Sequence, residues 1–186
     1  MTIIETIESE LCRLNICIDE FPEAPADYDD LGVMACFHRR YDLGDNHDYS
    51  LAEVQAIEKN KEYLTLPIYM YEHGGIAISS SPFSCPWDSG RLGLFFIKKE
   101  EARSYFGVRR LTKKCEESIL SRWQSKIDYT NAYNNGSVYG YQAVDNSEDV
   151  VASCWSYWGS EARTQMIDDA TFELKHVFGV EEISWS

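Results

Sequence analysis

The chain has no Cys-x-x-Cys pair, no long apolar run and no basic leader segment. The first absence excludes a zinc ribbon and a thioredoxin motif, because both need closely spaced thiols. The longest apolar runs, LGLFFI and LPIYMY, fall far short of the ~20 residues that a membrane helix needs. The first residues, MTIIETIESEL, lack the basic segment and apolar block of a secretory signal. We therefore expect a cytoplasmic protein with no membrane association.

Recognised catalytic and cofactor motifs are also missing. The sequence contains no Gly-x-Ser-x-Gly, and HGGIAIS matches neither a dinucleotide fingerprint nor a phosphate loop. Asp42, Asp45 and Asp48 lie three residues apart beside His47, whereas a calcium loop needs oxygen ligands two residues apart. We predict no catalytic residue, no metal site and no cofactor, and an enzyme is the less favoured hypothesis.

The cysteines are interpreted as structural residues. They stand at positions 12, 17, 36, 85, 115 and 154, and four of them lie in apolar strand-like runs or on a helix. Free cysteines of this kind are usually small buried hydrophobic residues. A disulfide framework is not expected in a chain that has the features of an intracellular protein.

The length and composition predict one globular domain over residues 1–186. Apolar residues make up 44% of the chain and aromatic residues 13%, which excludes a disordered protein. Hydrophobic periodicity predicts strands and helices that alternate irregularly along the chain. The expected strands are 14–20, 31–41, 62–72, 76–79, 91–99, 137–145 and 149–159, and the expected helices are 51–61, 99–107, 113–133 and 160–177. This order predicts an α+β fold with a mixed, mostly antiparallel sheet and helices packed on one side.

Local signals sharpen several of these elements. Ser50, with Glu53 three residues later, predicts a capping box at the start of a helix. Pro67 predicts that strand 62–72 lies at a sheet edge or a bulge. Residues 21–30, FPEAPADYDD, contain two prolines and four acids, and they predict an exposed acidic loop between two strands of a hairpin. The last helix is expected to turn five apolar residues inward: Met166, Ile167, Ala170, Leu174 and Val177.

Residues 81–93, SPFSCPWDSGRLG, form the most unusual stretch of the sequence. Cys85 is a candidate nucleophile only if a histidine reaches it, and the spacing links no histidine to it. The structural interpretation is favoured: the prolines stiffen a loop, Trp87 fills a core, and Asp88-Ser89-Gly90 turns the chain.

The net charge of −14 is unevenly distributed along the chain. Residues 1–60 hold 14 acids and 4 bases, residues 61–130 hold 8 and 11, and residues 131–186 hold 9 and 2. Such a chain cannot bind a nucleic-acid backbone over most of its surface, because phosphate binding needs clustered lysine and arginine. It attracts basic partners in a salt-dependent way, or its acidity merely keeps it soluble.

Three motifs resemble a family of uncharacterised proteins that are common on bacteriophages and mobile elements. They are LPIYMYEHGGIAIS, the loop FSCPWDSG, and VYGY followed by CWSYWG, and the likeness spans most of the chain after residue 28. The family brings no established catalytic residues. It implies an accessory protein of a genetic parasite in the host cytoplasm, where such proteins often block restriction enzymes or CRISPR effectors.

Two functional hypotheses follow. The first is an inhibitor of a host nucleic-acid-directed defence, of the anti-CRISPR or anti-restriction type, which imitates phosphate charge and occupies a basic surface of the host protein. Its predicted binding residues are nine acids: Asp19, Glu20, Glu23, Asp27, Asp29, Asp30, Asp42, Asp45 and Asp48. The second is an enzyme or a protein that sequesters a small ligand. Its predicted pocket comprises His38, Arg39, His73, Cys85, Trp87 and Asp88. A virion or replication accessory protein is a third possibility, and the oligomeric state is left open.

Overall fold

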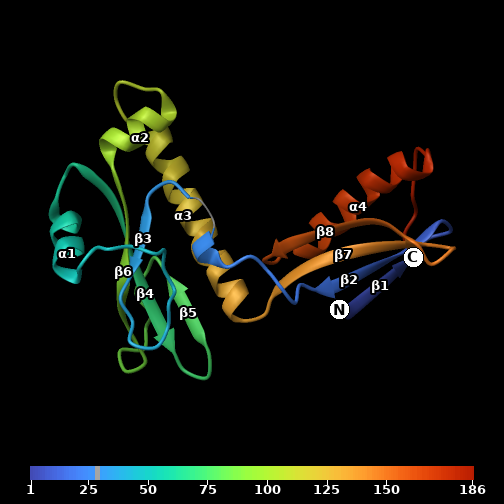
Figure 1. The fold of residues 1–186 in the computed structure, drawn as a ribbon, viewed down its shortest axis with the longest axis horizontal. Helices are drawn as coiled ribbons and strands as arrows, with labels where there is room; N and C mark the ends of the chain where they lie inside the picture. Colours follow the sequence, from blue (N-terminus) through green and yellow to red (C-terminus); the bar gives the residue numbers. More distant parts are fainter. Residues whose placement is uncertain (28–29) are drawn as a thin grey trace. The chain divides into compact units, whose positions relative to one another are not determined.

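The computed structural model describes residues 1–27 and 30–186, and it divides the chain into two compact units. The terminal unit comprises residues 1–23 and 132–186, and the central unit comprises residues 24–131. Each unit is built around an antiparallel four-stranded sheet, so the predicted α+β class with antiparallel strands is confirmed (Figure 1). The strands are divided between two sheets, whereas the sequence led us to expect one.

The terminal unit is a four-stranded sheet covered on one face by a helix. Its strands are β1 (Thr2–Glu8), β2 (Cys12–Ile18), β7 (Val138–Asp145) and β8 (Val150–Trp158), in the order β1-β2-β7-β8. Helix α4 (Ala162–Phe178) packs mainly on β8 and β7 (Figure 1). Leu14 and Ile16 of β2 form the core of this unit together with Met166 and Leu174 of α4. Val177 is 48% exposed, so its predicted inward orientation is wrong.

The central unit carries helices on both faces of its sheet. Its strands are β3 (Val33–Cys36), β4 (Tyr63–Glu72), β5 (Ile76–Ser79) and β6 (Ser89–Lys98), in the order β3-β6-β4-β5. Its helices are α1 (Leu51–Lys59), α2 (Lys99–Phe106) and most of α3 (Lys113–Asn134), with a short 3₁₀ turn, η1 (Pro25–Asp27).

Alternation along β6 directs its side chains to opposite faces of the sheet. On one face Phe95 stacks on Trp123 of α3, with ring centroids 5.1 Å apart. On the other face Phe96 packs with Val54 of α1. The sequence predicted helices on one side only, because helical periodicity shows that a helix has a buried face but not which sheet face it covers.

Two local signals of the sequence, the capping box at Ser50 and the edge or bulge at Pro67, are confirmed. The Ser50 side chain accepts a hydrogen bond from the Glu53 amide (3.3 Å), and the Glu53 carboxylate accepts one from the Ser50 amide (2.8 Å). Strand β4 pairs with β6 on one side, whereas on its other side β5 pairs only with residues 69–72. Pro67 therefore lies in a part of β4 that has no neighbouring strand on that second side, and it is next to a register shift at Ile68.

The predicted pairing of strands 14–20 and 31–41 is wrong. Strand β2 pairs with β1 and β7, whereas β3 pairs with β6 in the other sheet. Strand β1 was not predicted. Pairing between distant segments depends on tertiary packing, which the local pattern of one strand does not encode.

None of the helices in residues 1–27 and 30–186 has the length and apolarity that crossing a lipid bilayer requires.

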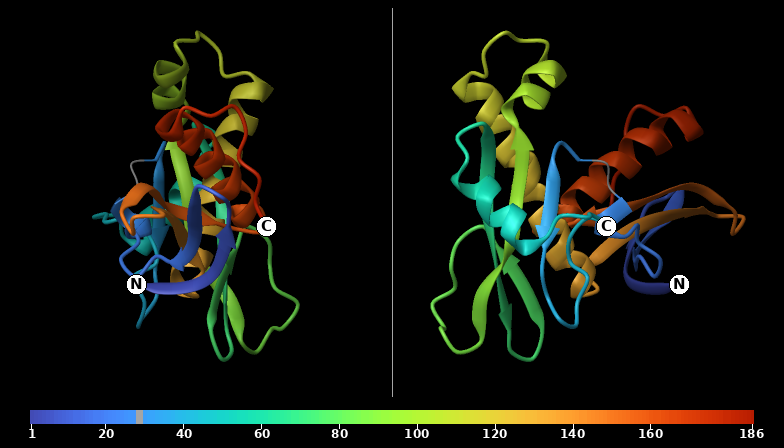
Figure 2. Two further views of the ribbon diagram at one scale, coloured as in Figure 1. Left: turned by 90° about the vertical axis from the view of Figure 1, so that its right-hand side faces the viewer. Right: turned by 60° about the vertical axis from the view of Figure 1, so that its left-hand side comes forward.

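The loop 80–88 lies beside the β4–β5 turn at one end of the central sheet, as both views of Figure 2 show.

Candidate functional site

The negative charge of the protein is concentrated in the terminal unit. That unit contains 15 acids and 3 bases in 78 residues, a net charge of −12. The central unit contains 16 acids and 14 bases, a net charge of −2. A field of one sign on one compact unit raises the local concentration of cationic partners and speeds their association.

An open hollow of about 600 Å³ lies in the terminal unit where β2 ends. Carboxylates and apolar side chains line it together: Ile18, Asp19, Glu20, Phe21, Glu23 and Trp155. The ring of Trp155 rests on Gly140 of the neighbouring strand, where a Cβ would overlap the indole. The absence of a side chain at Gly140 therefore gives Trp155 its place in the wall of the hollow.

The backbone after β2 projects one aromatic ring into solvent. The Asp19 carboxylate accepts a hydrogen bond from the Phe21 amide (3.1 Å), and the Asp19 amide donates to the Val138 carbonyl (2.9 Å). This turn leaves Phe21 92% exposed. An exposed aromatic side chain beside carboxylates is typical of a surface that binds a partner.

Glu20 is fixed in its ionised form. Its carboxylate pairs with the Met1 ammonium (3.0 Å) and accepts a hydrogen bond from the Thr2 hydroxyl (3.1 Å). These hydrogen bonds lower the pKa of Glu20 below its ordinary value. The carboxylate therefore stays charged at every physiological pH.

The nine predicted binding acids do not all belong to this hollow. Asp19, Glu20 and Glu23 line it, whereas Asp27, Asp30, Asp42, Asp45 and Asp48 belong to the central unit. Asp27, Asp42 and Asp48 are exposed. Asp29 lies outside the described residues.

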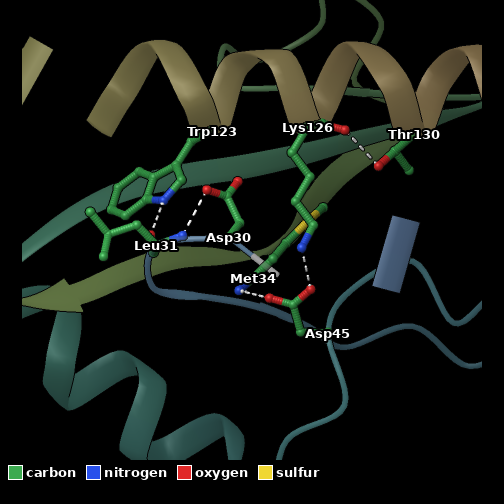
Figure 3. A network of polar contacts seen from close by, with 7 residues as sticks. All are labelled: Asp30, Leu31, Met34, Asp45, Trp123, Lys126 and Thr130. Carbon is green, nitrogen blue, oxygen red and sulfur yellow. Dashed lines mark hydrogen bonds and ion pairs between the residues drawn. The ribbon is translucent and has the colours of Figure 1, made fainter. Parts of the chain in front are cut away.

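The assignment of Asp45 to a partner surface is wrong. Its carboxylate pairs with the Lys126 ammonium (2.6 Å) and accepts a hydrogen bond from the Met34 amide (2.8 Å), as Figure 3 shows. The side chain of Lys126 is 4% exposed and that of Asp45 is 18% exposed. Asp45 therefore neutralises a buried charge inside the central unit, and it is not available to a partner.

Asp30 has a structural contact in the same region (Figure 3). Its carboxylate accepts a hydrogen bond from the Leu31 amide (2.7 Å), and the Leu31 carbonyl accepts one from the Trp123 indole (2.7 Å). These bonds attach the start of β3 to α3.

The second predicted site, around residues 81–93, is partly assembled. The Asp88 carboxylate lies 3.3 Å from His73 Nδ1 and 3.6 Å from Cys85 Sγ. A cysteine nucleophile needs an imidazole between the thiol and the carboxylate. Here the carboxylate stands between the thiol and the imidazole, so this geometry is not that of a catalytic triad.

Trp87 points away from the protein. It is 92% exposed, so the prediction that it fills a core is wrong. Two hydrogen bonds to backbone carbonyls fix the loop: the Ser89 hydroxyl donates to the Cys85 carbonyl, and the Glu72 amide donates to the Asp88 carbonyl (2.8 Å). These bonds hold the neighbours of Trp87 and leave its side chain in solvent.

Beside this loop lies a smaller hollow of about 330 Å³. Of the predicted pocket residues, His38, Trp87 and Asp88 line it, together with Glu72 and Arg91. His73 and Cys85 do not line it but contact the carboxylate of Asp88, which does. Arg39 is exposed and lies outside the lining. Among residues 1–27 and 30–186, no three His, Cys, Asp or Glu side chains are arranged to hold a metal ion.

Sequence reasoning missed two features of the acidic hollow. No signal in the sequence links Trp155 to Asp19, which lies 136 positions earlier. The exposure of Phe21 could have been inferred from its position inside a proline-containing acidic loop.

Comparisons of the chain with protein-family models, with curated proteins and with solved structures find no match. The likeness to bacteriophage and mobile-element proteins therefore stays a prediction.

Proposed function

We propose that this protein is a bacteriophage-type inhibitor that acts in the host cytoplasm on a host defence protein directed at nucleic acid. The terminal unit docks on a basic surface that otherwise holds a phosphate backbone. One observation carries the proposal: a net charge of −12 on 78 residues, with three carboxylates set around the aromatic side chains of one hollow.

The physical basis is charge imitation combined with an apolar anchor. Carboxylates compete with phosphates for lysine and arginine, and the attraction weakens as salt screens it. Phe21 and Trp155 add contact area that a bare acidic surface lacks, since aromatic side chains supply much of the energy at protein interfaces. The resemblance of three motifs to phage proteins suggests the biological setting.

Reversal of two charges in the hollow tests the proposal. The chain is expressed in bacteria that carry a defined restriction or CRISPR system, and the plating efficiency of a susceptible phage is measured. We expect the wild-type chain to restore plating against at least one such system. We expect Asp19→Lys/Glu23→Lys to abolish that effect. The affinity of the wild-type chain for the purified defence complex should fall steeply as the salt concentration rises. Glu20 is left in place because its pair with Met1 orders the chain.

The matched control is Asp42→Lys/Asp48→Lys, which makes the same change in charge on exposed acids of the central unit. It is expected to keep the inhibition. If the two variants behave alike, or if the wild-type chain restores plating against no system, the proposed role of the hollow is wrong.

A second candidate function belongs to the hollow beside residues 81–93. The observation that favours it is the Asp88 carboxylate, held by His73 and Cys85 at the base of the exposed Trp87. This arrangement suits a small polar ligand that stacks on an indole and bonds to a carboxylate. Trp87→Ala/Asp88→Ala would then remove activity in cells while leaving every protein complex of the chain intact.

A further inference from the structure

Four strands form the outer edges of the two sheets: β1, β8, β3 and β5. At three of these edges, hydrogen bonds from elsewhere in the chain reach one residue of the strand. Ser186 exchanges two backbone bonds with Glu8 of β1 (2.9 and 3.4 Å), and Asp45 covers β3. The Asn131 side chain bonds both the amide and the carbonyl of Ile78 on β5 (2.7 and 2.9 Å). Covering an edge in this way prevents unwanted strand pairing.

Strand β8 differs from the other three in its length of nine residues and in its hydrogen bonds, whereas β3 and β5 also lack charged residues and proline. The sequence of β8, VVASCWSYW, contains no charged residue and no proline, which are the usual protections of a free edge. Register shifts at Val151 and Ser156 leave Ala152–Trp155 as its regular stretch. Among the described residues, no hydrogen bond from a covering segment reaches the backbone of this stretch.

Helix α4 extends apolar side chains over the same edge. A hollow of about 510 Å³ lies between α4 and β8, and its walls include Cys154, Tyr157, Phe172 and Val177. Phe172 is 70% exposed, although it belongs to a helix whose opposite side is buried. A strand added beside Ala152–Trp155 would bury these apolar side chains.

The charges around the edge select the partner. In the same hollow, Tyr157 donates to the Asp169 carboxylate (2.7 Å) and Tyr141 donates to the Glu173 carboxylate (2.9 Å). Burial raises the pKa of both phenols, so they remain donors to these two charges. A second copy of the chain would bring −12 against −12, whereas a cationic segment is attracted.

The two sides of β8 lead to different surroundings. Cys154 faces the hollow under α4, whereas the next residue, Trp155, lines the acidic hollow on the other face of the sheet. An added strand with alternating side chains would therefore meet Phe172 and Val177, with two tyrosine-bonded carboxylates beside them, on one side, and the carboxylates of the acidic hollow on the other.

We propose that β8 is a strand-addition site for an extended cationic segment of a partner protein, in which apolar and basic residues alternate. Its backbone pairs with Ala152–Trp155, its apolar side chains pack on Phe172 and Val177, and its basic side chains turn toward Asp19 and Glu20. The proposal rests on the proposed function, because it names how the acidic unit holds its basic partner.

The test uses the whole chain and a short synthetic peptide of alternating valine and lysine. We expect saturable binding, with slowed amide hydrogen exchange over residues 152–155 and slowed alkylation of the exposed Cys154. Cys115 of the central unit is the internal control, and its alkylation should not change. The Thr112 hydroxyl donates a hydrogen bond to Cys115 Sγ and lowers the pKa of that thiol, which favours its reactive thiolate form.

A matched pair of variants locates the binding site on α4. Phe172→Lys/Val177→Lys changes exposed side chains of the hollow, and we expect it to weaken binding at least about tenfold. Thr164→Lys/Gln165→Lys adds the same charge at exposed positions of α4 outside the hollow, and we expect it to weaken binding less than about twofold.

Several outcomes would overturn the strand-addition site: protection of β1 instead of β8, equal binding of a valine–glutamate peptide, or a dimer of the chain that itself protects β8. Failure here is distinguishable from failure of the proposed function. If the peptide protects β8 but no defence system is inhibited, only the inhibitor role is lost. If Asp19→Lys/Glu23→Lys abolishes inhibition and the peptide never protects β8, only the strand-addition site is lost.

Discussion

Lys126 shows how a single side chain can hold three segments together. It comes from α3, and its ammonium pairs with Asp45, which in turn exchanges hydrogen bonds with Met34 of β3. Because the lysine is buried, its charge depends on this partner: transfer of an unpaired charge into the protein interior is costly. The pair therefore determines where residues 42–48 run, more than any local preference of that turn-rich stretch.

Replacement of the lysine tests this account. Lys126→Met removes the cation and leaves the Asp45 carboxylate half-buried without it, and we expect a loss of about 3 kcal/mol in the free energy of unfolding, measured in urea. The double variant Lys126→Met/Asp45→Asn removes both charges and keeps an acceptor for the Met34 amide, so it should recover part of that loss. Lys113→Met, at an exposed lysine, should cost less than about 0.5 kcal/mol. A cost for Lys126→Met no larger than for Lys113→Met would contradict the account.

At the residue scale, the type of a side chain did not always predict whether it points into the core or into solvent. Cys17 is buried, as predicted, and burial raises its pKa; burial also raises the pKa of Cys36 to about 12. Cys154 is exposed instead, and Trp87 points into solvent. The hydrophobicity of a residue favours burial, but the backbone of a short edge strand or a tight loop decides where its side chain points.

At the element scale, one ion pair joins β1 to α4. The Arg163 guanidinium donates two hydrogen bonds to the Glu5 carboxylate (2.8 and 2.6 Å). This fork geometry lowers the pKa of Glu5 and raises that of Arg163. The outermost strand β1, which the sequence did not predict, is thus attached to the helix that covers its sheet.

The pair predicts a dependence of stability on pH. The pKa of Glu5 is lower in the folded state than the ordinary value of 4.5, so its contribution is present above about pH 4.5 and is lost as pH falls through the folded value. Wild type should therefore resist urea better than Glu5→Gln at pH 7, and the difference should shrink as the pH falls below 4.5 through the folded-state pKa. Glu161→Gln, at an exposed position before α4, should follow the wild-type profile. A constant difference between wild type and Glu5→Gln across this range would show that the ion pair contributes nothing.

Helices and strands with short-range sequence signals were predictable, but the strands with which each strand pairs were not. The Ser50 cap and the placement of Pro67 depend on neighbours in the sequence, and both are confirmed. The pairing of β3 with β6 joins segments about 60 residues apart, and β2 pairs with β7 across an even longer interval. Such pairings depend on packing of the whole unit.

For the whole molecule, the grouping of charge is a product of the fold. Counted along the chain, acids dominate both ends and bases balance them in the middle. The structure brings the two ends into one unit, so that unit holds nearly all of the net charge. The sequence could therefore predict an acidic surface, but it could not predict that Trp155 would share a hollow with Asp19 or that Asp45 would be used internally.

The central unit is an insertion between β2 and the β7–β8 hairpin, and this order governs how the protein is made. As the chain leaves the ribosome, residues 24–131 can fold first, while the β1–β2 hairpin waits for the strand that pairs with it. The acidic unit is completed only after β7, β8 and α4 have been synthesised. A chain that stops before β7 thus carries no assembled acidic unit, and it cannot engage a partner through that unit.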